Sequence, residues 1–293
     1  MDYKIILFLI GIIIIIYLFI CNFLTLPLSS GSKLQNFSFG DAQNSVHKLV
    51  AVMVEPRIEN TVETIQRYMN ILPEYTHFQI FHGNLNHTLL QNSFSNEIAN
   101  NKISLHHLNV DNLDILNYNH ICTSIPFWES ISSENILVFQ TDSTPCSKST
   151  SQIEDFYEYD YIGAPMDNTL NNFIHFYLLG KGIYCNFKNY MNGGLSFRKK
   201  SKMIQVLKQY PWDEKVPEDV WFCMALYQTN GKLPSKQIAR TFSFESDKLE
   251  NAKIPWGLHK PRKDFKTLSS ICPEIKYIPI AKRHSDYRNF FLL

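Results

Sequence analysis

The amino end of the chain is an apolar stretch that a soluble domain accommodates poorly. Ile5 to Cys21 is 17 residues without a charge, and residues 12–16 are five consecutive isoleucines. A helix that crosses the core of a bilayer needs about 17–25 mostly apolar residues. A helix buried within a domain is disfavoured, because no face of this segment is polar. The stretch therefore predicts a membrane-spanning helix.

A cleaved signal peptide is the alternative reading of this stretch. The apolar part of a signal peptide is typically about 7–15 residues long and ends at small residues. Here the run is longer, and only Ser29–Ser32 offers a loose cleavage signal. We therefore expect an uncleaved anchor over residues 1–26. Lys4 precedes the apolar stretch and is partly offset by Asp2, so the positive-inside rule slightly favours a cytoplasmic amino end. The expected topology is therefore a single-pass type II protein that faces the ER or Golgi lumen.

Glycosylation motifs and cysteines bear on the same topology. The sequons that begin at Asn36 and Asn86 fit a glycoprotein with a lumenal domain. Five of the six cysteines lie outside the apolar stretch, and none forms a CxxC pair, which argues against a structural zinc site of the paired-cysteine type. One or two disulfides could form, but buried thiols are an equal alternative, and spacing does not reveal the pairing.

Charge and composition narrow the class of domain that follows the apolar stretch. Lys plus Arg is 28 and Asp plus Glu is 27, which gives a net charge of +1 and argues against a nucleic-acid partner. A hydrophobic fraction of 45% argues against a disordered chain. Residues 27–45 are polar and contain Ser and Gly, so they predict a stem. Residues 46–293 are expected to form one globular domain.

Short apolar runs alternate with helical patterns in the first half of this domain. Buried strands are predicted at 48–54, 77–81, 103–108 and 135–139. Helices are predicted at 58–72 and at 117–131, the second with a break at Pro126. This alternation predicts an α/β domain with a mainly parallel sheet. In the less regular second half we expect extended pieces at 161–164, 194–198 and 239–245, and helices at 200–210 and 218–230.

Polar motifs follow this pattern at places where a ligand could bind. Ligands of parallel sheets bind beyond the carboxyl ends of the strands. Asp142 comes just after the strand at 135–139 and could hold a divalent cation, although an Asp that caps a turn is as common. Gly193 and Gly194 permit close approach of the backbone to a ligand, but a simple turn explains them as well.

Two further motifs lie nearer the carboxyl end. Glu218 and Asp219 lie at the start of a predicted helix, where the helix dipole favours acidic residues. Alternatively, one of the two carboxylates could face a pocket and act as a general base. His259 could ligate a metal and Lys260 could bind phosphate, while an ordinary surface loop is the alternative. The other histidines show no metal-ligand spacing, so we expect them to be structural or exposed.

The order of these motifs resembles a known layout. An Asp after a central strand, then Gly-Gly, then Glu-Asp at a helix start and a late His, is similar to the glycosyltransferase-A fold, with a Rossmann-like first half. The segments 127–143, 159–165, 192–198, 217–220 and 257–260 resemble a domain family of unknown function that is regarded as glycosyltransferase-like. The Gly-Gly and Glu-Asp-Val segments are also similar to those of the fringe and β-1,3-galactosyltransferase group.

The resemblance implies roles for the matching residues. Such enzymes carry an Asp-x-Asp motif whose last Asp binds Mn²⁺ or Mg²⁺ under the donor diphosphate, and this position is Asp142. The first Asp is replaced by Gln140. The late His of these folds completes the metal shell, which points to His259, with Lys260 near the diphosphate. Asp219 is implied as the catalytic base.

Further roles follow from the same resemblance. Glu218 would support Asp219 or contact the acceptor. Asn192, Gly193 and Gly194 would lie against the donor sugar or the acceptor. Arg57, after the first strand, would lie near the nucleoside. The implied protein is a membrane-anchored hexosyltransferase that moves a sugar from a nucleotide-sugar donor, UDP-linked by analogy, to a hydroxyl of a glycan or glycoprotein acceptor.

Two other functions compete with this one. A non-catalytic membrane protein that binds a glycan or nucleotide through a degenerate transferase fold is favoured by Gln140. A glycoside hydrolase needs two carboxylates about 5–9.5 Å apart, and the α/β strand pattern with a late His-Lys pair fits it poorly.

Overall fold

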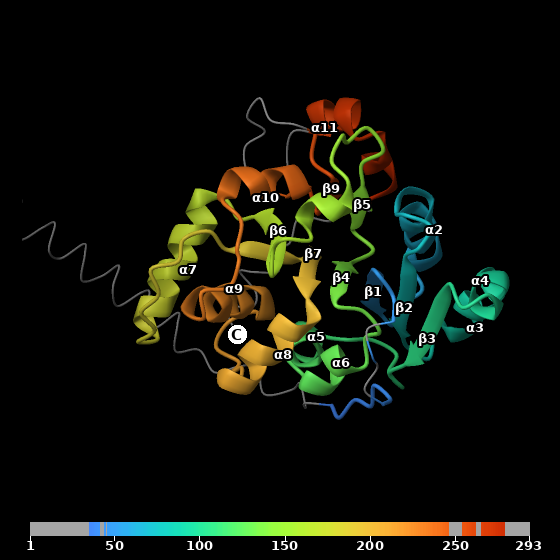
Figure 1. Ribbon diagram of the computed structural model, residues 1–293, viewed down its shortest axis with the longest axis horizontal. Coiled ribbons are helices and arrows are strands. Elements are labelled where there is room, and N and C mark those ends of the chain that lie inside the picture. The colour runs from blue at the N-terminus through green and yellow to red at the C-terminus, as the bar shows by residue number, and fades with distance from the viewer. Residues whose placement is uncertain (1–34, 42–43, 45, 246–253, 262–264, 279–293) are drawn as a thin grey trace, which may run out of the picture.

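The computed structural model places one broad sheet across the molecule (Figure 1). The structure describes residues 35–41, 44, 46–245, 254–261 and 265–278. The predicted anchor at 1–26 lies outside the described residues, as does most of the predicted stem at 27–45. None of the helices in the described part combines the length and the apolar character needed to span a bilayer.

Within the described residues the central sheet has six strands in the order β3–β2–β1–β4–β7–β6, and Figure 1 shows them from β6 on the left to β3 on the right. Their bounds are β1 Val50–Glu55, β2 His77–His82, β3 Ile103–His107, β4 Asn135–Phe139, β6 Tyr161–Pro165 and β7 Met191–Lys199. Strands β1 to β4 pair in parallel, and β7 runs antiparallel to both of its neighbours. The expected α/β domain with a mainly parallel sheet is therefore confirmed.

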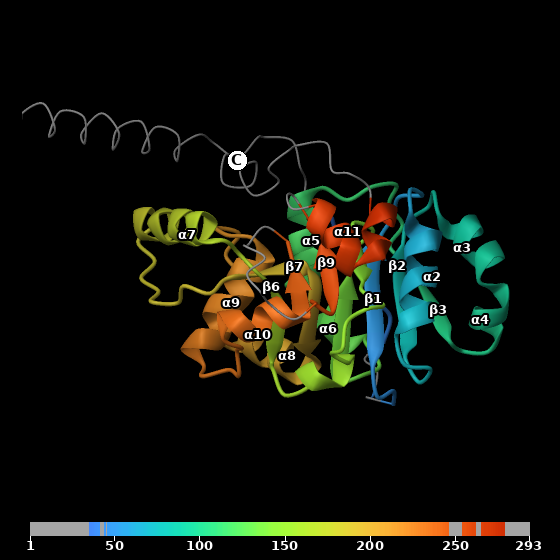
Figure 2. The same ribbon diagram turned by 90° about the horizontal axis from the view of Figure 1, so that it is seen from above.

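Helices surround the sheet, and Figure 2 shows them from above. Their bounds are α2 Thr61–Ile71, α3 His87–Ser93, α4 Ser95–Ala99, α5 Ile115–Cys122, α6 Ile125–Glu129, α7 Asn168–Gly180, α8 Lys200–Gln209, α9 Glu218–Gln228, α10 Lys236–Phe242 and α11 Phe265–Ile271. Two 3-10 turns, η1 Ile153–Phe156 and η2 Pro273–Tyr277, complete the described part. Asp114 caps α5 and Asp167 caps α7, since each side chain accepts a backbone N–H of the first turn.

Three local expectations need correction. The helical stretch expected at 117–131 does break, but at residues 123–124 and not at Pro126, which lies in the first turn of α6, where its missing N–H costs nothing. The extended piece expected at 239–245 is wrong for most of its length, because α10 continues to Phe242. Ser235, whose side chain accepts the N–H of Ile238, is the start signal of that helix. The sequence pattern did not predict α7.

The glycosylation motif at Asn86 is inaccessible in the folded protein. The Asn86 side chain is fully buried and donates to the carbonyl groups of Glu55 and Arg57. A buried amide with these partners cannot accept a glycan, so this sequon gives no support for a lumenal domain. Asn36, in contrast, is exposed.

A second sheet, above the central one in Figure 1, positions the carboxyl-terminal segment. Its strands are β5 Ser143–Pro145, β9 Gly257–His259 and β8 Ser243–Phe244, with β9 in the middle. Strand β9 runs antiparallel to β5, and the register pairs His259 with Ser143. This pairing brings the end of β9 against the turn that follows β4.

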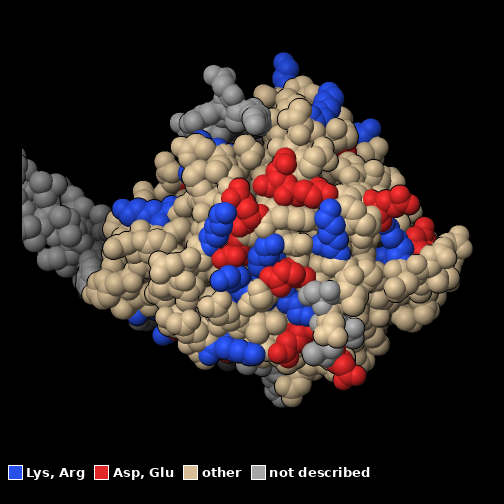
Figure 3. All heavy atoms as spheres, viewed as in Figure 1, with Lys and Arg blue, Asp and Glu red and all other residues tan. Residues whose placement is uncertain are grey.

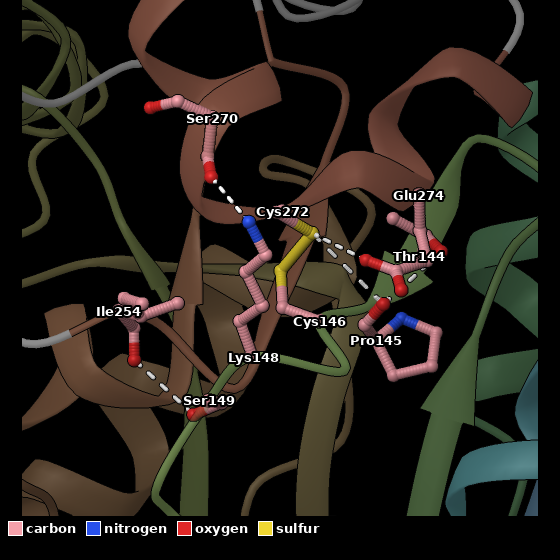
Figure 4. Close-up of a disulfide and its surroundings, with 9 residues drawn as sticks. All are labelled: Thr144, Pro145, Cys146, Lys148, Ser149, Ile254, Ser270, Cys272 and Glu274. Atoms are coloured by element: carbon pink, nitrogen blue, oxygen red, sulfur yellow. Dashed lines mark hydrogen bonds between the residues drawn. A yellow bond between two sulfur atoms is a disulfide. The ribbon is translucent and has the colours of Figure 1, made fainter.

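A disulfide joins Cys146, just after β5, to Cys272, just after α11 (Figure 4). The remaining cysteines of the described part, Cys122, Cys185 and Cys223, are free and buried. Lys148 donates to the carbonyl of Ser270 at 2.9 Å beside the disulfide. The cross-link therefore holds the segment around β9 against the rest of the domain.

We expect the double substitution Cys146→Ala/Cys272→Ala to lower the free energy of unfolding by about 2–5 kcal/mol, because a cross-link across a long loop restricts the unfolded chain. Denaturant unfolding of the full chain in detergent measures the change. Cys185→Ala, which removes a free buried thiol, is the matched control and should cost less. Equal losses in the two variants would mean that the cross-link adds no stability.

Candidate functional site

A cavity of about 340 Å³ opens where β1 and β4 end. Its walls come from segments far apart in the chain: the ends of β1 and β4, the loop before α5, the first residues of β7 and α9, and the end of β9. Every residue predicted from the sequence as a site residue lies in its lining. These are Arg57, Gln140, Asp142, Asn192, Gly193, Gly194, Glu218, Asp219, His259 and Lys260.

Asp142 lies between two basic side chains. Nε2 of His259 is 3.3 Å from its Oδ1, and Nζ of Lys260 is 3.3 Å from its Oδ2. The N–H of Lys260 also donates to the carbonyl of Asp142 at 3.0 Å. Lys260 has a left-handed backbone with φ of 40°, a strained conformation for a side chain of this type that is commonest at functional sites. The pairing of β5 with β9 thus brings Asp142 together with His259 and Lys260, which are far from it in the sequence.

His259 also contacts Gln140 and Glu245. Its Nε2 is 3.3 Å from Oε1 of Gln140, and its Nδ1 is 3.7 Å from Oε2 of Glu245. Burial alone would lower the pKa of His259, but Asp142 and Glu245 raise it to about 9. Burial likewise opposes the charge of Asp142, and His259 and Lys260 hold the pKa of its carboxyl well below the usual value.

Asp142 and His259 are the residues of the cavity lining that could contact a divalent cation. In the described part of the chain, Oδ1 of Asp142 is buried without a hydrogen-bond partner, and it lies 3.3 Å from Nε2 of His259. Glu245 on the far side of the imidazole is the carboxylate that commonly orients a metal-bound His. Among the described residues no three His, Cys, Asp or Glu side chains form a metal group. A cation held here would therefore take its other ligands from phosphate and water, as Mg²⁺ often does.

The two glycines of β7 separate this cluster from the acidic pair. A Cβ on Gly194 would collide with His259 and Gln140, and a Cβ on Gly193 would collide with Glu218 and an Arg198 nitrogen. Both glycines therefore leave room for side chains of the cavity itself, and their approach to a ligand stays a prediction. A bulkier residue at either position would push the wall apart.

Glu218 forms a fully buried ion pair. Arg198 donates to both of its carboxylate oxygens, at 2.8 and 3.0 Å, and also contacts the carbonyl of Gly193 at 3.3 Å. The guanidinium is wholly buried among the rings of Trp128, Tyr161 and Phe222. Burial opposes its charge, but Glu218 keeps the pKa of Arg198 above its ordinary value. Both oxygens of Glu218 are thus engaged in holding β7 against α9.

Asp219 faces the cavity beside this pair. Its Oδ2 accepts the N–H of Gly193 at 3.0 Å and its Oδ1 accepts the N–H of Val220 at 2.8 Å. Only 6% of the residue is exposed. Two backbone donors fix the orientation of the carboxylate, which a base needs in order to meet a substrate hydroxyl.

Arg57 lies in the part of the cavity lining that follows β1. It donates to both oxygens of Glu55, from Nε at 2.8 Å and from Nη2 at 2.7 Å. Glu55 in turn lies 3.4 Å from the hydroxyl of Thr141. Hydrogen bonding to Glu55 raises the pKa of Arg57. This chain of contacts joins the end of β1 to the Gln140–Asp142 turn.

Sequence reasoning gave no site role to Arg198 or Glu245 and gave Glu55 only a position. Arg198 ends a motif that predicts a strand, and Glu245 ends a segment predicted as extended. Glu55 belongs to the segment expected near the nucleoside, but its contact with Arg57 was not predicted. A charged residue inside a largely apolar strand, as Arg198 is, was the signal that could have revealed the buried pair.

Figure 3 shows acidic and basic side chains gathered together at the centre of the face seen in Figure 1. The two signs are interspersed there, so this face presents no continuous basic surface.

Comparison with known families gives one match. Residues 102–259 match the family described as "Protein of unknown function (DUF5672)". That stretch is more than half of the 293 residues and includes all of the predicted site residues except Arg57 and Lys260. The match lends no support to the similarity with the fringe and β-1,3-galactosyltransferase group. No curated protein matches this chain.

Solved structures of glycosyltransferases are similar to the chain at low identity. The apo structure of the bifunctional glycosyltransferase WbbM matches at 7% identity with a TM-score of 0.46, over 88% of this chain and 52% of that one. Apo GlyE from Streptococcus pneumoniae TIGR4 matches at 12% identity and 0.41, over 74% and 56%. The mannosyltransferase PcManGT from Pyrobaculum calidifontis, in complex with GDP-Man and Mn²⁺, matches at 9% identity and 0.36, over 75% and 59%.

The chain thus spans between half and three fifths of the length of these proteins. At these identities and TM-scores the similarity establishes no activity for this chain.

Proposed function

The chain belongs to the DUF5672 family of unknown function, and we propose that its cavity transfers a sugar from a nucleotide-sugar donor, UDP-linked, to a hydroxyl of a glycan or glycoprotein. The observation that carries the proposal is the arrangement around Gly193 and Gly194. On one side of these glycines lie Asp142, His259 and Lys260, and on the other lies Asp219. One cavity therefore holds groups for a diphosphate and a base for a hydroxyl.

The diphosphate is the leaving group, and its charge must be stabilised as the bond to the sugar breaks. Lys260 supplies a positive charge to it. Mn²⁺ or Mg²⁺, when bound by Asp142 and His259, would supply a Lewis acid there. Glu245 orients the His259 ring through its Nδ1 side. Gln140 keeps an oxygen near His259 but removes one negative charge relative to an Asp-x-Asp motif.

The acceptor hydroxyl loses its proton as it attacks the sugar. Asp219 takes this proton, because Glu218 is committed to Arg198 by both oxygens. The N–H groups of Gly193 and Val220 hold Asp219 in place during the transfer. Asn192, whose side-chain oxygen accepts the N–H of Gly194 at 2.7 Å, shapes the wall where the donor sugar would lie.

Compartment and fold type complete the proposal. We assign residues 1–26 to an anchor, 27–45 to a stem and 46–293 to a catalytic domain of the glycosyltransferase-A type that faces the ER or Golgi lumen. The disulfide between Cys146 and Cys272 supports the lumenal side, because disulfides persist in oxidising compartments.

Release of UDP or GDP from a panel of nucleotide-sugars by the full chain in detergent, with Mn²⁺ and with EDTA, tests the function. Slow hydrolysis of one donor that stops in EDTA identifies the sugar and supports a metal-dependent transferase. If neither release nor nucleotide binding occurs with any donor, the non-catalytic alternative replaces this proposal.

Asp142→Ala should weaken UDP binding in Mn²⁺ by at least about tenfold, because it removes the anionic ligand of the cation. Calorimetric titration with UDP, in Mn²⁺ and in EDTA, measures the loss. Asp213→Ala, which breaks an exposed ion pair with Lys215, is the matched control and should bind as wild type. Unchanged UDP affinity in Asp142→Ala would remove this residue from the metal site.

A further inference from the structure

Helix α9 begins at the cavity without a cap from its own N-cap residue. That residue is Pro217, whose ring offers no oxygen to the N–H groups of the first turn. The first turn carries Glu218 and Asp219, both buried in the cavity lining, so its placement decides where the proposed base lies. A buried helix end needs a partner from elsewhere in the fold.

Asn119, on α5, supplies this partner. Its Oδ1 accepts the N–H of Glu218 at 2.7 Å, although the two residues are 99 positions apart in the chain. Its Nδ2 donates to the carbonyl of Ile115 at 2.7 Å, so both ends of the amide are used and its orientation is fixed. Asn119 is 3% exposed and lies in the cavity lining. The cap of α9 is therefore a buried side chain of another helix.

Helix α5 is itself held at both ends. In its first turn, Asp114 accepts the N–H of Asn117 at 2.7 Å. Where the helix ends, the indole N–H of Trp128 donates to the carbonyl of Cys122 at 2.7 Å. A side chain on a helix that is fixed in this way can hold a second element in place, because its own backbone has little freedom to move with that element.

Glu218 is consequently held at three atoms. Asn119 engages its N–H, and Arg198 engages both of its carboxylate oxygens. Asp219 is the next residue, and its Oδ2 accepts the N–H of Gly193 at 3.0 Å. Without Asn119, Glu218 would be tied to Arg198 only through the end of its side chain. The backbone of the first turn, and Asp219 with it, could then shift relative to β7.

We propose that Asn119 is a positioning residue for the transfer reaction, because its cap on α9 sets the place of the Asp219 carboxylate. The inference rests on the proposed function, since it takes Asp219 as the base. A general base must lie within hydrogen-bond reach of the hydroxyl that it deprotonates. A misplacement of about 1 Å can cost about 10²-fold in rate.

Amide hydrogen exchange of the full chain in detergent, resolved to single residues, tests the cap without reference to catalysis. Asn119→Ala should speed exchange of the Glu218 N–H by at least about tenfold, because this donor loses its acceptor. Asn119→Asp keeps an oxygen for the N–H and should restore most of the protection. Asn117→Ala is the matched control on the same helix. Its side chain accepts the N–H of Gln35, so exchange at Glu218 should stay as in wild type.

Transfer kinetics test the effect on the base. Asn119→Ala should lower kcat by about 10–100-fold and keep the affinity for UDP in Mn²⁺ within about twofold of wild type. Asn119→Asp should regain most of the lost kcat, and Asn117→Ala should have the wild-type kcat. A cap that served only stability would lower the amount of folded protein without this split between kcat and affinity.

The proposed function and this inference fail in different ways. If the wild-type chain transfers no sugar, the proposed function is lost, and exchange at Glu218 still decides whether Asn119 fixes the first turn of α9. The inference is overturned if Asn119→Ala transfers sugar at the wild-type rate, or if its Glu218 N–H exchanges as in wild type.

Discussion

Replacing Asp219 by Asn is expected to reduce sugar transfer by about 10²–10⁴-fold and to leave nucleotide binding nearly unchanged. Asn has the same shape and can still accept a backbone N–H from Gly193 or Val220, so the wall of the cavity should persist. It cannot take a proton from the acceptor hydroxyl, and the loss of a general base typically costs a factor of this size.

Two measurements separate this role from a structural one. Transfer rate with saturating donor and acceptor should fall, while calorimetric affinity for UDP in Mn²⁺ should stay within about twofold. Asp213→Asn changes a carboxylate at an exposed ion pair and should have normal activity. If Asp219→Asn transfers sugar at the wild-type rate, another group is the base.

Replacing Arg198 by Met is expected to lower the free energy of unfolding by about 3–5 kcal/mol. The guanidinium is fully buried and donates twice to Glu218, which is itself only 3% exposed. Removing one partner of such a pair leaves the other charge buried without compensation, and this causes most of the loss. Met fills similar space among the surrounding rings, so the change mainly removes charge.

A double variant distinguishes the lost charge pair from a packing defect. Arg198→Met/Glu218→Gln removes the orphaned carboxylate and should recover much of the stability, because exchanging a whole buried pair for neutral residues costs far less than breaking it. Denaturant unfolding of both variants measures the difference. A double variant no more stable than Arg198→Met alone would show that packing, and not charge, dominates.

Much of the fold follows from local patterns. The run of apolar residues at 135–139 is β4 with the same bounds, and the run at 48–54 is the fully buried β1 shifted by a residue or two. A strand covered on both faces needs side chains that are apolar throughout, so the pattern is visible within a few residues. α10 was missed because its seven residues show no clear period, and only the capping by Ser235 marks its start.

The candidate site was predictable as a set of residues but not as an arrangement. Gly194 stood out as a place of close approach, yet nothing nearby in the sequence indicated that His259 and Gln140 occupy the space beside it. Glu218 and Asp219 are neighbours in the sequence, and the structure separates their roles because Arg198, on another element, takes only Glu218.

The sequence by itself determined the class of domain, its mainly parallel sheet and a set of candidate residues that line one cavity, because burial period and motif order are properties of short segments. Only the tertiary structure decided which groups pair: Asp142 with His259 across β5 and β9, and Glu218 with Arg198 between α9 and β7. These contacts depend on strand register and on how helices pack against the sheet, and such long-range geometry is set by the whole core at once.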